Sequence, residues 1–168
     1  MPVLDVEQDV DARSMTVTAE FAAEPERVWR LYEDPRQLER HWGPPSWPAT
    51  FVEHDLVPGG RSHYFMTGPD GERAHGVWRV TAVDRPRSFE LEDAFADEHG
   101  VPNEELGWTH MAVAVEPVTG GSRVRIVSTF QSVEQLQQML EMGMADGMRE
   151  ALGQIDALLA ASASTGAR

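Results

Sequence analysis

The chain of 168 residues contains no cysteine and no lysine, so all 14 of its basic residues are arginines. Without cysteine it has no thiol nucleophile, no disulfide and no cysteine-ligated zinc or iron–sulfur cluster. Without lysine it forms no Schiff base with a substrate or pyridoxal phosphate and has no P-loop lysine. The sequence also lacks a G-x-S-x-G elbow and a dinucleotide fingerprint. We therefore expect no cofactor.

Positive charge is scarce, because 28 acidic residues oppose the 14 arginines and the net charge is −14. Such a surface repels phosphate backbones and anionic lipids, so we expect neither nucleic acid nor membrane insertion. No stretch approaches the roughly 18 apolar residues of a membrane span. The acidic N-terminus lacks the basic and apolar regions of a signal peptide, which favours a cytoplasmic location. The six histidines show no HxxxH or HxH spacing, so no metal site is expected.

The length suits one domain, which we predict over residues 15–161. Residues 1–14 have no clear periodicity and are predicted to be a disordered acidic arm, and residues 162–168 a frayed tail. Residues 15–21 alternate as in a half-buried strand. Pro25 suits the first turn of a helix, and Asp34-Pro35 offers a cap and first turn for a second, short one.

From residue 49 to about residue 130 the sequence favours six strands. Gly68-Pro69-Asp70-Gly71 and Thr119-Gly120-Gly121 are strong turn signals between them. Ser132 and Gln135 then fit a capping box. Apolar residues follow at steps of three and four, which predicts one long helix over residues 133–160. Because strands and helices do not alternate as βαβ units, we predict an α+β fold whose sheet is antiparallel, with the helices on one side.

These pieces, in this order, resemble the activator-of-heat-shock-ATPase-like branch of the START-like (SRPBCC) superfamily. The resemblance rests on FAAEPERVWRLYEDPRQLERHWGP, DLVPGGRSHYFMTGPDG, GVWRVTAVDRPRSFEL and VEPVTGGSRVRIVSTF, followed by the long helix. It covers roughly residues 15–160. Two positions depart from the family pattern. His41 precedes Trp42 where paired tryptophans are common, and Gly147 precedes Met148 where a Gly-Trp pair is common.

The resemblance implies a helix-grip (START-like, Bet v-like), in which a curved antiparallel sheet wraps around a long C-terminal helix and encloses a cavity. Members of the superfamily bind lipids, polyketides or hormones, or act as co-chaperone modules, and a minority are cyclases, aromatases or hydrolases. Fold alone does not choose among these roles.

Aromatic residues and methionines are the expected walls of such a cavity, since both suit small apolar ligands. Two glycines in the C-terminal helix, Gly143 and Gly147, each cost about 1 kcal/mol relative to alanine, and either close packing against the sheet or room for a ligand would explain them. His41 and His110 are the candidates for a general base, since each lies within two residues of an expected wall tryptophan. The predicted ligand-binding residues are Trp42, Tyr64, Met66, Trp78, Trp108, His110, Met144 and Met148.

The sequence thus favours binding or carriage of a small apolar or aromatic molecule. Two alternatives stay open. One is a cofactor-free enzyme of cyclase or aromatase type, which needs a titratable side chain in the cavity. The other is a protein–protein module, in which the acidic surface engages a basic partner or the chain forms a homodimer.

Overall fold

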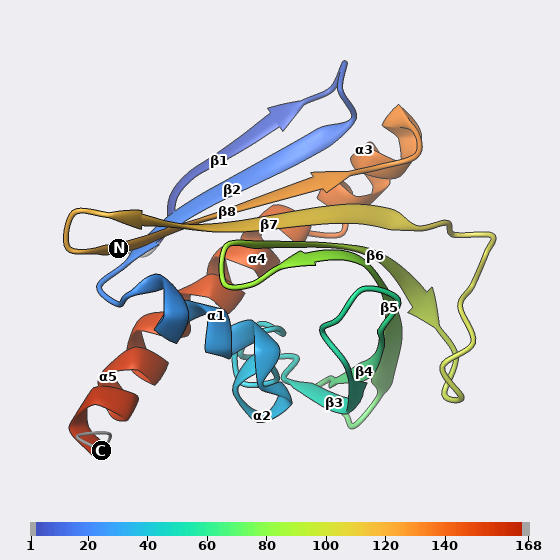
Figure 1. Ribbon diagram of the computed structural model, residues 1–168. Helices are drawn as coiled ribbons and strands as arrows, with labels where there is room; N and C mark the ends of the chain where they lie inside the picture. The colour runs from blue at the N-terminus through green and yellow to red at the C-terminus, as the bar shows by residue number, and fades with distance from the viewer. Residues whose placement is uncertain (1–2, 166–168) are drawn as a thin grey trace.

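The computed structural model describes residues 3–165 as one curved antiparallel sheet and a set of helices (Figure 1). The strands are β1 (Val3–Asp9), β2 (Ser14–Phe21), β3 (Ala49–His54), β4 (Arg61–Thr67), β5 (Arg73–Asp84), β6 (Ser88–Ala96), β7 (Thr109–Val118) and β8 (Gly121–Thr129). The helices are α1 (Pro25–Glu33), α2 (Pro35–Leu38), α3 (Val133–Glu141), α4 (Met144–Gly153) and α5 (Ile155–Thr165). No helix among the described residues is long and apolar enough to cross a membrane.

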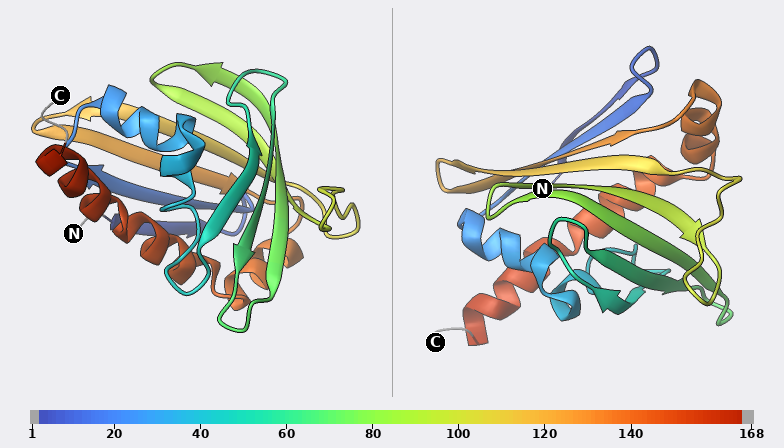
Figure 2. Two further views of the ribbon diagram at one scale, coloured as in Figure 1. Left: turned by 90° about the horizontal axis from the view of Figure 1, so that it is seen from below. Right: turned by 45° about the vertical axis from the view of Figure 1, so that its right-hand side comes forward.

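The eight strands lie in the order β1-β2-β8-β7-β6-β5-β4-β3, and every neighbouring pair is antiparallel. Strands that follow one another in the sequence are paired, except that β2 pairs with β8 from the far end of the chain and not with β3. The C-terminal helices cross the concave face of this sheet (Figure 2). The predicted α+β helix-grip is therefore confirmed.

The core lies between the concave face and the helices. The alternation predicted for β2 is confirmed, because Met15, Val17, Ala19 and Phe21 are all buried. Helix α1 buries the apolar side chains that recur at helical spacing, among them Trp29. Burying a large apolar side chain contributes about 1.5–3 kcal/mol, so the inner face of β2 and the buried face of α1 account for much of the stability.

The C-terminal helix is not continuous, and the prediction of one helix over residues 133–160 is wrong in this respect. Helix α3 ends at Glu141, and α4 begins after Gly143, whose φ is +88°. A left-handed residue cannot continue a right-handed helix, and glycine adopts this conformation without steric cost. The Ser132 cap is present, with the Gln135 amide donating to Ser132 Oγ at 3.0 Å.

Toward both termini, the described residues are more regular than predicted. Residues 3–9 form β1, which pairs with β2, so a disordered arm over residues 1–14 is wrong for this segment. Backbone pairing and the half-buried Val6, which packs against the core, order it despite its acidic composition. Helix α5 continues to Thr165, into the predicted frayed tail, and residues 166–168 lie outside the described residues.

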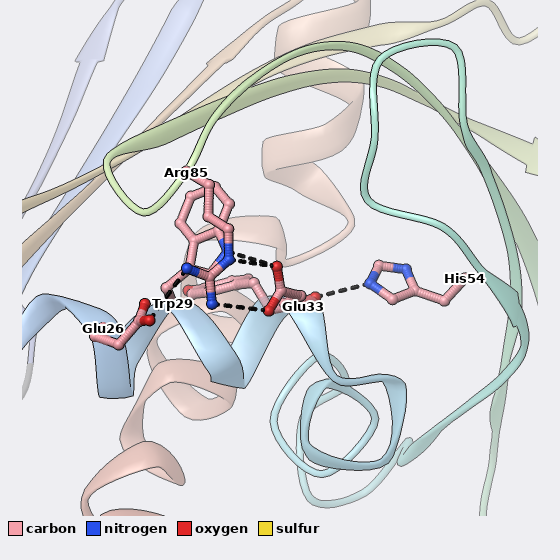
Figure 3. A network of polar contacts seen from close by, with 6 residues as sticks. Glu26, Trp29, Glu33, His54 and Arg85 are labelled. Carbon is pink, nitrogen blue, oxygen red and sulfur yellow. Dashed lines mark hydrogen bonds and ion pairs between the residues drawn. The ribbon is translucent and has the colours of Figure 1, made fainter.

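Helix α1 is held against the sheet by a polar network around Arg85, in the turn between β5 and β6 (Figure 3). Arg85 Nε donates to Glu33 at 2.8 Å and Nη1 donates to Glu26 at 3.1 Å. Trp29 Nε1 donates to the same Glu33 carboxylate. On β3, His54 Nε2 donates to the carbonyl of Tyr32 at 2.8 Å. These contacts position the end of α1 that carries Tyr32 beside the cavity described next.

Candidate functional site

A cavity of about 360 Å³ lies between the concave face of the sheet and the segment from α3 to α4. Its volume falls within the range of small-molecule sites. Strands β4, β6, β7 and β8 supply one wall, and the helices and the segment after α2 supply the rest. The lining residues are Tyr32, His41, Trp42, Pro44, Tyr64, Met66, Asp93, Ala94, Phe95, Gly107, Thr109, Met111, Ile126, Ser128, Phe130, Met139, Met142, Gly143, Met144, Gly147, Met148, Ala151 and Leu152.

Two glycines of the helical wall keep space open. Gly143 and Gly147 both line the cavity, and a Cβ added at either position would have no heavy atom within 4 Å. Close packing against the sheet therefore explains neither glycine, although the left-handed backbone of Gly143 is reason enough for that residue. The prediction that they leave room is consistent with this geometry. Met142 beside the helix break is 65% exposed and Phe95 on β6 is 37% exposed, so the cavity has an apolar mouth at this point.

Five of the eight predicted site residues lie on the cavity wall, namely Trp42, Tyr64, Met66, Met144 and Met148. The two aromatic rings pack edge to face, with 6.1 Å between their centroids. Alternation in β4 puts Tyr64 and Met66 on the same face, and the family resemblance implies that this face points inward. The structure thus brings the tyrosine, one tryptophan and the methionines of α4 together around one space.

Trp78 is not on the wall, although it faces the same side of the sheet. It is buried behind Trp42, with 4.8 Å between their ring centroids, and it also packs against Phe51. Its place in the cavity wall was predicted from its residue type. The structure makes it part of the core that supports Trp42, because the loop after α2 covers it.

Trp108 and His110 lie on the opposite, convex side of the sheet, so their predicted place in the cavity wall is wrong. Thr109 and Met111 line the cavity, and side chains alternate between faces along a strand, which sends residues 108 and 110 outward. Trp108 packs beneath the guanidinium of Arg79 and donates to Glu104 at 2.9 Å. His110 is an exposed partner of a glutamate on β6.

A carboxylate that the predicted residues did not include is the main polar feature of the cavity. Asp93 on β6 lines the cavity, and its carboxyl group is buried although the residue as a whole is partly exposed. Its Oδ1 accepts a hydrogen bond from Tyr64 Oη at 3.0 Å. Burial raises the pKa of Asp93 to about 7, although the hydrogen bonds from Tyr64 and from the Ala94 amide lower it. Burial and the nearby Asp93 carboxylate raise the pKa of Tyr64, which therefore stays protonated.

Strand alternation contains the signal for Asp93. Phe89, Leu91, Asp93 and Phe95 occupy one face of β6, and the first two are buried in the core. An acidic residue on the apolar face of a strand is uncommon unless it is paired or functional. The neighbouring Glu90 and Glu92 are on the other face, which hides the pattern in a run of acidic residues.

His41 also lines the cavity, but as a neutral group. Its Nε2 donates to the Leu31 carbonyl at 2.8 Å, and burial lowers the pKa of His41 to about 4. The proton is therefore on Nε2 in this structure, and this nitrogen is already engaged. His41 serves to join α1 to the loop after α2, and the role of general base considered for it has no support in this geometry.

The site therefore combines a largely apolar, aromatic and methionine-rich wall with one carboxyl group whose pKa lies near neutrality. Such a wall favours apolar ligands through desolvation. Asp93 adds one directional polar contact, and the charge of its carboxyl group depends on pH and on the molecule that binds beside it.

The chain is similar to a known protein family and to several solved structures. The family model described as activator of Hsp90 ATPase homolog 1-like protein matches residues 22–160. A crystal structure of a Mycobacterium smegmatis protein is similar with 52% identity and a TM-score of 0.88, over 96% of this chain and 99% of that one. A solution NMR structure of an Arthrobacter aurescens protein is similar with 54% identity and a TM-score of 0.89, over 94% of this chain and 92% of that one.

More distant structures agree in fold. The crystal structure of a Silicibacter pomeroyi protein has 22% identity and a TM-score of 0.72, over 89% of this chain and 99% of that one. Among curated proteins, none matches the chain.

Proposed function

This chain belongs to the family of activator of Hsp90 ATPase homolog 1-like proteins, and we propose that it binds or carries a small hydrophobic or aromatic molecule in its internal cavity. The observation that carries this proposal is the cavity of about 360 Å³ with Gly147 in its helical wall. Gly147 lies inside α4, where glycine costs about 1 kcal/mol relative to alanine, and no close neighbour in the fold requires it. Gly143, which also lines the cavity, is already required by its left-handed backbone.

The energetics favour an apolar occupant. An empty cavity lacks the dispersion contacts that a packed core makes, so filling it with an apolar molecule restores them. Met139, Met144 and Met148 add flexible walls that adapt to the shape of the molecule. The exposed Phe95 and Met142 at the mouth offer an apolar path inward.

The test compares two glycines of α4. Gly147→Leu places a side chain in the cavity, whereas Gly153→Leu makes the same change on the same helix at an exposed position outside the cavity. Native mass spectrometry of the freshly purified proteins, with denaturing extraction, measures the bound small molecule. We expect a stoichiometric adduct on the unmodified chain and on Gly153→Leu, and its loss in Gly147→Leu.

A bare mass for all three proteins, also after incubation with mixed lipids and aromatic compounds, would refute the proposal. An adduct that persists in Gly147→Leu would show that the molecule binds elsewhere on the surface.

A second candidate is cofactor-free acid–base catalysis, which Asp93 favours, because a carboxyl with a pKa near 7 suits proton transfer at neutral pH. Incubating each extracted compound with the protein and with Asp93→Asn tests it. Conversion by the first and not by the second would support catalysis, and recovery of every compound unchanged from both would exclude it for those compounds.

A further inference from the structure

Asp93 has no cationic partner among the residues that the structure describes. Its side chain accepts a hydrogen bond from the neutral phenol of Tyr64, and no arginine lines the cavity. Buried carboxylates in proteins are normally paired with a cation, since burying an isolated charge is costly. A carboxyl group that lacks its countercharge at the wall of a ligand-sized cavity indicates that the countercharge comes with the ligand.

The surrounding walls also suit a cation. Tyr32, Trp42, Tyr64, Phe95 and Phe130 all line the cavity, and the face of an aromatic ring attracts a positive charge. The net charge of −14 draws cations toward the molecule and repels anions. An anionic ligand would meet Asp93 without any lining arginine to pair with, so the electrostatics oppose it.

We infer that the ligand is a small amine with an aromatic or branched apolar body, which binds as the ammonium ion with Asp93 as its counter-ion and Tyr64 as the residue that orients the carboxylate. This inference rests on the proposed function, because it assigns a chemical class to the same cavity.

The pH dependence follows from the groups that face Asp93. The other titratable residues of the lining are Tyr32, His41 and Tyr64. Both tyrosines have a raised pKa, and the pKa of His41 is lowered to about 4, so all three side chains are neutral at pH 6 to 8. The lining residues of α3 and α4 carry no titratable group. With an Asp93 pKa of about 7, the ionised fraction rises about tenfold between pH 6 and pH 8. Amine affinity should rise by about the same factor.

A neutral ligand with a carbonyl oxygen would show the opposite trend. It would accept a hydrogen bond from the acid form of Asp93 and would therefore bind more tightly at pH 6 than at pH 8. The sign of the pH dependence thus separates an amine from a carbonyl compound in the same cavity.

The experiment uses three probes with one apolar body: 2-(1-naphthyl)ethylamine, 2-(1-naphthyl)ethanol and 1-naphthylacetate. Isothermal titration calorimetry measures their affinities for the full chain at pH 6 and pH 8. At pH 8 we expect the amine to bind at least about tenfold more tightly than the alcohol, and the acid to bind most weakly.

Two variants locate the effect. Asp93→Asn should abolish both the preference for the amine and the pH dependence. Glu92→Gln makes the same change of net charge at the preceding residue, which pairs with Arg79 on the convex face, and should leave both unchanged.

Equal binding of amine and alcohol, or tighter binding of either at pH 6, would overturn the amine assignment while leaving the proposed function intact. An amine preference that persists in Asp93→Asn would overturn the role of Asp93. Failure of all three probes to bind, together with a bare mass in native mass spectrometry, would overturn the proposed function itself.

Discussion

Asp93→Asn is expected to stabilise the ligand-free protein at alkaline pH. The pKa of Asp93 is about 7 in the folded protein and 3.8 for an unperturbed aspartate. Between these values the folded state binds more protons than the unfolded state, so this group makes the free energy of unfolding fall as pH rises from 4 to 7. The destabilisation is absent below about pH 4 and complete above pH 7.

The magnitude follows from the size of the shift. One pKa unit corresponds to about 1.4 kcal/mol, so the shift from 3.8 to about 7 destabilises the folded state by about 4 kcal/mol at pH 8. Asparagine has the same shape, and its Oδ1 still accepts from Tyr64. We therefore expect Asp93→Asn to gain up to about 4 kcal/mol over the unmodified protein at pH 8, and much less at pH 4.

Urea unfolding at pH 4, 5, 6, 7 and 8, followed by circular dichroism, provides the assay. The quantity of interest is the difference in unfolding free energy between Asp93→Asn and the unmodified protein, because titrations common to both cancel in it. Glu92→Gln controls for the loss of one negative charge, since its carboxylate is on the convex face.

A difference that stays constant from pH 4 to pH 8, or a variant that is less stable at pH 8, would refute the reasoning. Either result would mean that the Asp93 carboxyl is well solvated in the folded protein, and the cavity would then lack its titratable group. A gain that follows pH would identify Asp93 as a group that costs stability, as functional residues commonly do.

Three further outcomes are expected. Gly147→Ala and Gly153→Ala should each raise the unfolding free energy by about 0.5–1 kcal/mol in urea titrations, since neither Cβ meets a neighbour; a loss at position 147 would contradict the open space there. Trp108→Phe should leave the affinity for 2-(1-naphthyl)ethylamine within about twofold by calorimetry, because Trp108 is on the convex face. His41 is buried with a pKa of about 4, compared with 6.5 when unperturbed, so the folded protein should lose about 3 kcal/mol of stability as pH falls from 6.5 to 4. Urea titrations in the Asp93→Asn background should show this loss, and His41→Gln should remove it.

Much of the sheet could be predicted because one face of each strand is buried. In β2 the alternation from Met15 to Phe21 indicates both the strand and its inner face. In β4 both faces carry aromatic residues, so alternation alone does not choose the inner face; the family resemblance implies that Tyr64 and Met66 point inward, and both line the cavity. Strand alternation predicts orientation well wherever the two faces differ in polarity.

Residue type alone predicted less well whether a tryptophan lines the cavity. Trp108 is large and apolar, yet it packs on the convex side, where the guanidinium of Arg79 covers its ring. Trp78 faces inward but lies behind Trp42. Whether an inward side chain reaches the cavity depends on what covers it, and a loop after a distant helix supplies that cover.

By itself, the sequence determined the fold class, most strand and helix positions and the absence of thiol and lysine chemistry, because these depend on periodicity, turn residues and composition. Only the tertiary structure decided that β1 is ordered by pairing with β2, that Gly143 breaks the C-terminal helix, and that Asp93 meets Tyr64 across β5. Each of these depends on which distant segments become neighbours, and local patterns carry no information about that.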